Sequence, residues 1–263
     1  MAAENNLKAL EEKSIFILRE ANAKFKHIAA LWSMGKDSTT MLALARKAFM
    51  GKIPFPVIYI DNGIDFPESY EFMEEMAKKW KLDLIVAKSD IKSELSGFSC
   101  CGANKTNALK KLMKERKFDA IIASIRRDEH SIRAKERYFS PRDSSFKWNY
   151  KNQPAELWGN YASKINGGSH FRVHPLLDWT ELDIWRYIKK EGMPINPLYL
   201  ARNGYRYRSL GCTHCTIPVK SNASSIDGII KELKTTKTEE RTGRSQDKEK
   251  AYIMEKLRSL GYM

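Results

Sequence analysis

The sequence lacks several features that would set its class at once. Its 263 residues contain no apolar run close to the roughly 18 residues that a membrane-spanning helix needs. It has no internal repeat and no low-complexity tract, and residues 1–6 are polar and lead into a helical pattern instead of forming the apolar core of a secretory signal. We therefore expect a globular protein of the cytoplasm.

Signatures of several common enzyme classes are also missing. The pattern Gly-x-x-x-x-Gly-Lys-Ser/Thr, which marks enzymes that cleave the γ-phosphate of a nucleotide, does not occur. We find no Ser/His/Asp arrangement of the kind that serves nucleophilic catalysis. There are only four cysteines, and none follows Cys215. In a reducing compartment, such a small number favours metal binding or redox chemistry over disulfides.

Positive charge, in contrast, is abundant. Lysine and arginine number 46 against 32 acidic residues, which gives a formal net charge of +14. This balance favours an anionic partner such as a nucleotide, sulfate, nucleic acid or an acidic protein surface, although a generally basic surface would look the same. Hydrophobic residues make up 42% of the chain, enough for one large domain or an α/β domain with an appended segment.

Apolar patterns of strand length and helix length alternate along the chain. After a first helix at 7–25, the predicted strands are 27–32, 57–60, 82–87 and 120–124, and the predicted helices are 39–49, 68–80 and 104–117. This alternation predicts an α/β fold with a doubly wound, mostly parallel sheet, whose ligand lies beyond the carboxyl ends of the strands.

The second half is less regular. Residues 131–170 show no clear pattern, 171–177 can add a strand, and Thr180 with Asp183 predicts the start of a helix that runs to about residue 190. A further helix is expected after Ser224 or Ser225. We expect residues 1–200 to form the nucleotide-binding domain with its N-terminal helix, and residues 201–263 to form an irregular and helical extension with a charged tail.

The segment between the first strand and the next helix has the composition of a phosphate-binding loop. Amide groups at a helix start carry the positive end of the helix dipole and bind phosphate oxygens. Gly35 lets the backbone approach an anion, Lys36 adds a cation, and Asp37 can cap the helix or help to hold Mg²⁺. An ordinary polar turn is the alternative. The predicted nucleotide-binding residues are Ser33, Gly35, Lys36, Asp37, Ser38 and Thr39, with Asp61 at the end of the second strand as a ligand of the ribose or a nearby helix cap.

This loop resembles the Ser-Gly-Gly-Lys-Asp-Ser loop of the ATP pyrophosphatases (the PP-loop superfamily), which split ATP between its α- and β-phosphates. The difference is Met34, which stands where that pattern has its first glycine. Because a side chain is disfavoured at positive φ, we expect the backbone at Met34 to avoid that region.

Many further segments are similar to the small, catalytic subunit of bacterial sulfate adenylyltransferase. They cover most of residues 31–247 in order, and only the stretch between Leu200 and Tyr205 is shorter than usual in that family. The matching segments are 47–49, 54–56, 59–63, 66–68, 126–129, 133–137, 139–143, 154–158, 179–185, 207–212, 221–223 and 240–244.

This resemblance implies that ATP and sulfate react to give adenosine 5′-phosphosulfate and pyrophosphate, with a GTPase subunit as partner because this anhydride is strongly uphill. Sulfate must approach an anionic α-phosphate, so cations aimed at the developing charge lower the barrier. Asp128 and Glu129 can orient the arginines or bind Mg²⁺, whereas surface salt bridges are the alternative for each residue. The predicted catalytic residues are Lys36, Arg126, Arg127, Asp128, Arg133, Lys135 and Arg137.

The four cysteines form two close pairs, Cys100 with Cys101 and Cys212 with Cys215. Four thiolates can hold a tetrahedral Zn²⁺ or a [4Fe–4S] cluster. The pattern resembles that of adenosine-phosphosulfate reductases, relatives with the same core, which favours a [4Fe–4S] cluster over Zn²⁺ or free thiols.

The cysteines also keep other functions open. An iron–sulfur adenosine-phosphosulfate or phosphoadenosine-phosphosulfate reductase is the second interpretation, but those enzymes use a further cysteine near the C-terminus. An iron–sulfur enzyme that thiolates nucleic acid is the third, although the chain has no recognisable RNA-binding appendage. A nucleotide-sensing or scaffold subunit is the non-enzymatic alternative.

Overall fold

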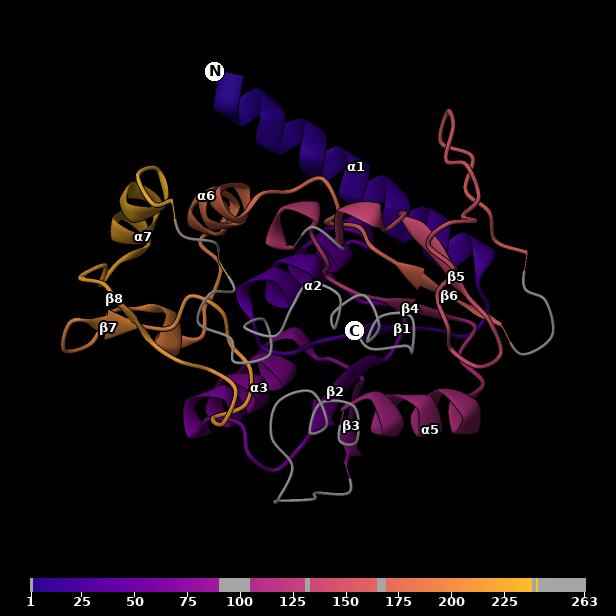
Figure 1. Cartoon of the computed structure of the whole chain (residues 1–263), viewed down its shortest axis with the longest axis horizontal. Coiled ribbons are helices and arrows are strands. Elements are labelled where there is room, and N and C mark those ends of the chain that lie inside the picture. The colour runs from indigo at the N-terminus through magenta and orange to yellow at the C-terminus, as the bar shows by residue number, and fades with distance from the viewer. Residues whose placement is uncertain (1, 90–104, 131–132, 165–168, 238–239, 241–263) are drawn as a thin grey trace.

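A six-stranded sheet forms the centre of the protein (Figure 1). The computed structural model describes residues 2–89, 105–130, 133–164, 169–237 and 240. The strand order is β3-β2-β1-β4-β6-β5, and all neighbouring strands are parallel except β5 and β6. The strands are β1 (Ile28–Leu31), β2 (Val57–Asp61), β3 (Leu84–Lys88), β4 (Ala120–Ile122), β5 (Phe139–Arg142) and β6 (His170–Val173). The mostly parallel, doubly wound α/β sheet expected from the sequence is confirmed.

Helices cover both faces of this sheet. They are α1 (Ala2–Lys24), α2 (Lys36–Ala48), α3 (Pro67–Trp80), α5 (Asn107–Arg116), α6 (Glu181–Glu191) and α7 (Ile226–Leu233). Three short 3₁₀ turns and a small antiparallel ribbon complete the described elements: η2 (Arg127–Glu129), η3 (Arg133–Lys135), η4 (Pro197–Tyr199), β7 (Tyr205–Arg206) and β8 (Val219–Lys220). None of the helices in the described ranges has the length and apolarity needed to cross a membrane.

Successive strand residues supply two separate cores. Ala30 and Val57 belong to the larger core, which contains residues of α1, α2 and α3. Ala29 and Ile58, their neighbours in sequence, belong to the smaller core with residues of α5. Side chains of a strand alternate between its two faces, so apolar residues at successive positions bury both faces of the sheet. Figure 1 shows α1 and α2 on one side of the sheet and α5 on the other.

Local capping explains two helix starts. The Thr180 side chain accepts from the amide of Asp183, and the Asp183 side chain accepts from the amide of Thr180, so the capping box expected before α6 is confirmed. Ser225, rather than Ser224, caps α7 by accepting from the amide of Gly228 at 3.2 Å.

The C-terminal extension packs against the main body of the protein. Leu210, Ala223 and Ile229 are buried in the same larger core as the sheet. A domain boundary near residue 200 remains a prediction.

One strand lies in a stretch that the sequence showed only as irregular. β5 has four residues, contains Pro141, and lies at the edge of the sheet, where β6 is its one partner among the described strands. Proline is tolerated at an edge because its missing N–H group removes no hydrogen bond that an inner strand would need. Such a short, polar strand produces no periodicity that could be recognised.

The strand order places a ligand site between β1 and β4. From β1 the chain continues through α2 to β2 on one side, and β4 lies against the other side of β1. In open α/β sheets the crevice at such a switch point, beyond the carboxyl ends of the strands, takes the ligand. The loops after β1 and β4 therefore face one another.

Candidate active site

The predicted phosphate loop lies at this switch point. α2 begins at Lys36, three residues before the apolar pattern at Thr39, so the loop includes the first turn of the helix. Gly35 is the N-cap residue and, as glycine, supplies no side-chain cap. Asp37 is the second helical residue and does not act as a cap. A helix start without a side-chain cap keeps amide groups that can bind an anion.

Met34 adopts a positive φ of 55°, so the prediction that its backbone avoids this region is wrong. The left-handed region costs a residue with a side chain about 1–2 kcal/mol. The Met34 side chain is only 2% exposed and packs in the larger core. Burial of this side chain contributes more than the backbone costs, so methionine is tolerated where the PP-loop pattern has glycine.

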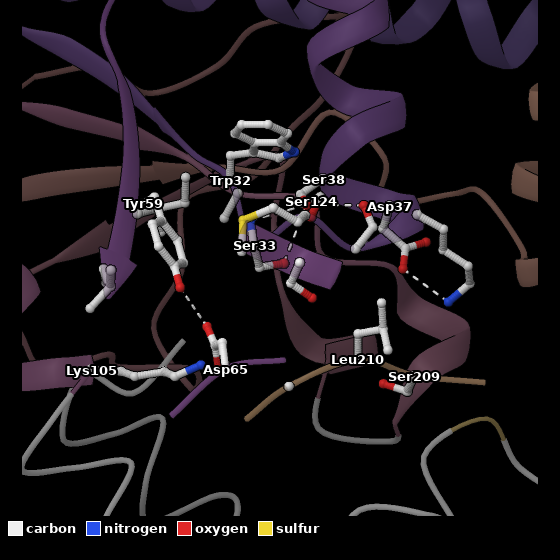
Figure 2. A pocket seen from close by; sticks show the side chains of 18 of the residues that line it. Trp32, Ser33, Asp37, Ser38, Tyr59, Asp65, Lys105, Ser124, Ser209 and Leu210 are labelled. Atoms are coloured by element: carbon white, nitrogen blue, oxygen red, sulfur yellow. Dashed lines mark hydrogen bonds and ion pairs between the residues drawn. The ribbon is translucent and has the colours of Figure 1, made fainter. Parts of the chain in front are cut away.

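The hydroxyl groups of the loop divide between the cavity and the core. Ser33 and Ser38 line the cavity (Figure 2), and their Oγ atoms lie 3.2 Å apart. Thr39 instead accepts from the indole N–H of Trp32 at 3.1 Å and lies outside the lining formed by the described residues. Thr39 therefore supports the loop from the core.

Gly35 allows a close approach of Tyr199, from η4, to the loop. A Cβ atom at position 35 would lie 3.3 Å from the Tyr199 hydroxyl and 3.4 Å from Ser33 Oγ. The Tyr199 hydroxyl accepts from the amide of Lys36 at 2.9 Å. Burial raises the pKa of Tyr199 to about 12, so its hydroxyl stays protonated at neutral pH and can donate to a bound anion.

Lys36 is a buried cation at the start of α2. Its side chain is 1% exposed, and Nζ lies 3.1 Å from Asp37 Oδ2 and pairs with Glu240 Oε1. Burial alone would lower the pKa of Lys36, but the charges of Asp37 and Glu240 outweigh it and raise the pKa. Lys36 therefore keeps its charge at any physiological pH.

Arg126 links the segment after β4 to the phosphate loop. Its side chain is completely buried, and its Nε donates to Asp128 Oδ1 at 2.9 Å. Its Nη1 pairs with Asp37 and its Nη2 with Glu240. Asp128 uses its second oxygen to accept from the amide of Glu181 at 2.8 Å. Asp128 thus orients Arg126 toward the loop.

Arg133, in η3, contributes a third cation. It lines the cavity and pairs with Glu129, which also lines it. Glu129 in turn accepts from the amide of Arg126 at 3.4 Å. This carboxylate therefore connects the two arginines, as the sequence suggested for Asp128 and Glu129 together.

Like Arg126, the other three predicted catalytic cations are absent from the cavity lining of the described chain. Arg127 pairs with Asp178. Lys135 is exposed and lies 4.6 Å from the centre of the Tyr150 ring. Arg137 is also absent from that lining. These three side chains are therefore not part of the cavity lining although they neighbour Arg126 and Arg133 in sequence.

Asp61 ends β2, but its side chain is engaged in the fold. Its Oδ1 accepts from the amide of Gly63 and from the hydroxyl of Tyr70, both at 2.8 Å. The N-cap residue of α3 is Phe66, so Asp61 does not cap that helix. Asp61 also lies outside the lining that the described residues form.

Asp65, four residues further on, lines the cavity instead. Its Oδ2 accepts from the Tyr59 hydroxyl at 2.7 Å, an interaction drawn in Figure 2. Its Oδ1 is buried and has no hydrogen-bond partner among the described residues. A buried acceptor without a partner is costly unless a ligand supplies the donor.

Two of the four cysteines lie in the same cavity lining. Cys212 and Cys215 are buried on one turn and form no disulfide, and the Cys215 amide donates to the Cys212 carbonyl at 3.1 Å. The hydrogen bond between the two thiol side chains, together with burial, raises the pKa of Cys212. Two thiols on one turn fit one side of a four-cysteine site. Cys100 and Cys101 lie outside the described residues, among which no group of three or more His, Cys, Asp or Glu side chains is placed to hold a metal ion.

Comparison with known proteins identifies the family. Residues 27–218 match the phosphoadenosine phosphosulfate reductase domain. Sulfate adenylyltransferase subunit 2 of Pseudomonas fluorescens (strain Pf0-1) is 41% identical over 298 residues, which cover 98% of each chain. The chain belongs to the sulfate adenylyltransferase subunit 2 family. The relative from Colwellia psychrerythraea (strain 34H / ATCC BAA-681) is also 41% identical, over 294 residues and 98% of each chain. Both alignments are longer than the 263 residues of this chain, so these relatives carry residues that it lacks.

Solved structures confirm the fold class. FMN adenylyltransferase from Candida glabrata, in complex with ATP, superposes with a TM-score of 0.62 at 18% identity, covering 92% of this chain and 88% of that one. Phosphoadenylyl-sulfate reductase from Candida auris, in a phosphate complex, gives a TM-score of 0.55 at 17% identity, covering 80% and 96%. At this level of identity the likeness concerns the fold alone.

Three residues of the cavity region escaped the sequence reasoning. Tyr199 and Glu240 contact Lys36 although they lie 163 and 204 residues away from it in sequence. Asp65 shares its loop with Asp61, and no pattern distinguishes the two carboxylates. Of these three residues, only Glu240 could have been singled out from the sequence, because it begins one of the segments that resemble the family.

Proposed function

We propose that this chain transfers AMP from ATP to sulfate, which gives adenosine 5′-phosphosulfate and pyrophosphate. The observation that carries the proposal is the buried Lys36 at a helix start whose N-cap residue is glycine, with Arg126 beside it, at the switch point of the sheet. This geometry suits a polyphosphate. The 41% identity to sulfate adenylyltransferase subunit 2 along the whole chain supports the choice of sulfate as the second substrate.

In this reaction an oxygen of sulfate attacks the α-phosphorus of ATP. The bond between that phosphorus and the oxygen bridging to the β-phosphate breaks, and pyrophosphate leaves with the bonding electron pair. Both reactants are anions, so Lys36 and Arg133 offset their repulsion and stabilise the charge on the leaving group. Preorganised donors of this kind are each worth about 3–4 kcal/mol of the barrier. The protonated Tyr199 hydroxyl adds a neutral donor beside Lys36.

We place the nucleoside end of ATP against Asp65 rather than Asp61. Asp65 Oδ1 has no partner among the described residues, whereas Asp61 Oδ1 already accepts two hydrogen bonds. A carboxylate that accepts from a ribose hydroxyl contributes about 1.5–3 kcal/mol. Asp65→Asn should therefore raise the KM for ATP about tenfold or more, while the matched change Asp61→Asn should leave it nearly unchanged. Equal effects on KM in the two variants would contradict this placement.

Mg²⁺ accompanies ATP in enzymes of this chemistry, and from the sequence Asp37 had two possible roles, a helix cap or a Mg²⁺ ligand. Both oxygens of Asp37 face cations, Oδ2 toward Lys36 and Oδ1 toward Arg126. This arrangement does not fit a divalent cation at Asp37, and no step of the proposed reaction uses one there.

The cysteine quartet is a separate part of the proposal. We infer that Cys212 and Cys215, with Cys100 and Cys101, hold a [4Fe–4S] cluster. When bound, such a cluster would fix the turn of Cys212, which lines the cavity. Iron and acid-labile sulfide analysis of anaerobically prepared protein should give about four of each per chain. Stoichiometric zinc would contradict the cluster.

The name of the relatives, subunit 2, implies a partner subunit. We propose that this partner is a GTPase, because forming a phosphosulfate anhydride is uphill and requires a coupled reaction. Product analysis with ATP, sulfate and GTP, with and without the partner, tests the function. Pyrophosphate should appear only when sulfate is present. ADP as product would contradict the proposal, reductant-dependent release of sulfite would indicate a reductase, and turnover stimulated by tRNA or DNA would indicate thiolation.

A further inference from the structure

Glu240 reaches the phosphate loop from the far end of the chain. Its side chain is 6% exposed, and its two oxygens face different cations: Oε1 pairs with the ammonium of Lys36 and Oε2 with the guanidinium of Arg126. One carboxylate therefore bridges the two buried cations next to the start of α2. Two charge-assisted contacts beside a helix N-terminus are also the arrangement by which a protein binds a phosphate or sulfate group.

The charge of Glu240 is maintained by these contacts. Burial alone would raise the pKa of Glu240, but the charges of Arg126 and Lys36 outweigh it and hold the pKa well below its usual range. The carboxylate is therefore an anion at neutral pH, with a charge of the same sign as the substrates. Two other contacts of Lys36 do not involve Glu240: its ammonium also pairs with Asp37, and its amide donates to the Tyr199 hydroxyl.

A substrate anion and Glu240 compete for the same two cations. Two like charges about 4 Å apart repel one another by about 4 kcal/mol at the effective dielectric constant of a protein surface. A phosphate or sulfate oxygen on Lys36 and Arg126 would lie about this close to the Glu240 carboxylate. Both anions therefore cannot occupy the site at once without a large loss of affinity.

We propose that Lys36 and Arg126 form an oxyanion subsite that Glu240 fills in the ligand-free chain, and that a tetrahedral oxyanion displaces Glu240 when it binds. This inference rests on the proposed function, since either a phosphate group of ATP or the sulfate substrate supplies such an anion. Pyrophosphate and sulfate, tested separately, distinguish the two sources.

Two variants of Glu240 show whether it weakens anion binding by occupying the subsite or only by its negative charge. Glu240→Gln removes the charge, whereas Glu240→Asp keeps it but is one methylene too short to reach both cations. Removing a competitor that occupies the site in 90–99% of molecules tightens the apparent affinity by about 10–100-fold. We expect calorimetry on the full chain to show this gain in both variants for pyrophosphate, sulfate or both. Glu232→Gln is the matched control, because Glu232 pairs with buried Arg206 at 2.6 Å outside the cavity, and its dissociation constants should equal those of the unmodified chain.

Displacement can also be observed without any variant. Hydrogen exchange at the peptide that contains Glu240 should become faster when the displacing anion saturates the unmodified chain, because the carboxylate leaves its two partners. Saturation without any change in that peptide would overturn the inference.

The remaining outcomes show whether the inference alone fails or the proposed function fails with it. If the unmodified chain binds these anions and Glu240→Gln binds them equally or more weakly, Glu240 holds the cations in place and the inference fails while the proposed function stands. If Glu240→Gln gains affinity but Glu240→Asp does not, the effect is charge alone and displacement is wrong. If neither pyrophosphate, ATP nor sulfate binds to any of the chains, the proposed function and the inference fail together.

Discussion

The loop after β1 and the segment after β4 are both rich in polar residues, but they place them very differently. In the first, Ser33, Lys36 and Ser38 all line one cavity. In the second, Arg126 is buried against the phosphate loop, whereas Arg127, the next residue, pairs with Asp178 away from the cavity. The two loops contain the same kinds of side chain, so composition does not explain the difference.

The backbone that follows each strand does explain it. The loop after β1 runs directly into α2, a helix of 13 residues, so the direction of each side chain in its first turn is set by helical geometry. The segment after β4 passes through two 3₁₀ turns of three residues each. With about three residues per turn, only every third side chain of such a turn points the same way, and a three-residue turn ends before that direction repeats, so only some of the cations reach the site. A basic residue in the sequence of a loop is therefore evidence for a site only when the local backbone directs it there.

The largest effect is expected in the first loop. Lys36→Ala should lower kcat/KM by about 10²–10³-fold, because it removes a preorganised cation from the developing negative charge. Lys47→Ala is the matched control on the same helix, since Lys47 pairs with Glu11 and Glu191 outside the cavity. Steady-state kinetics, with circular dichroism to verify folding, gives the measurement. A loss of stability without a loss of turnover in Lys36→Ala would show that the loop does not bind the substrate.

The adjacent residues Arg126 and Arg127 test the difference within the segment after β4. Arg126→Lys keeps the charge but cannot reach Asp37, Asp128 and Glu240 together, and should lower kcat/KM by about 10–100-fold. Arg127→Lys should change it by less than about threefold, because its pair with Asp178 is partly exposed. Steady-state kinetics of the two variants, measured in parallel, gives both values of kcat/KM. Equal losses would contradict the difference between the adjacent arginines.

The smallest effect tests the backbone of the first loop. Both Met34→Ala and Met34→Gly lose the buried side chain, but only Met34→Ala retains a Cβ atom at a φ of 55°. Met34→Gly should therefore be more stable than Met34→Ala by about 1 kcal/mol, opposite to the order expected at negative φ. Chemical denaturation measures both values. The reverse order would show that residue 34 does not adopt the left-handed conformation.

Much of the fold could be predicted because its signals are local. Each of β1 to β4 is a short apolar run, and α2, α3 and α5 have apolar residues at helical spacing. β5, β7 and β8 could not be recognised, since they are two to four residues long and pair at the sheet edge or in a separate ribbon. Their existence depends on partners that are distant in sequence.

The site was predicted in part. Lys36, with Ser33, Gly35 and Ser38, could be found because the motif and its setting between strand and helix lie within seven residues. The side chains that distinguish this cavity from a generic phosphate loop could not be found in the same way. Asp65 differs from Asp61 only in its contacts.

The amino-acid sequence by itself determined the α/β class, the family, and the phosphate loop at the start of the first crossover helix, because each of these is encoded in neighbouring residues. Only the tertiary structure decided that Arg126 rather than Arg127 faces the loop, and that Glu240 bridges Arg126 and Lys36. The physical reason is that an ion pair depends on distance and burial, and a chain brings carboxylates to cations from 204 residues away as easily as from the next one.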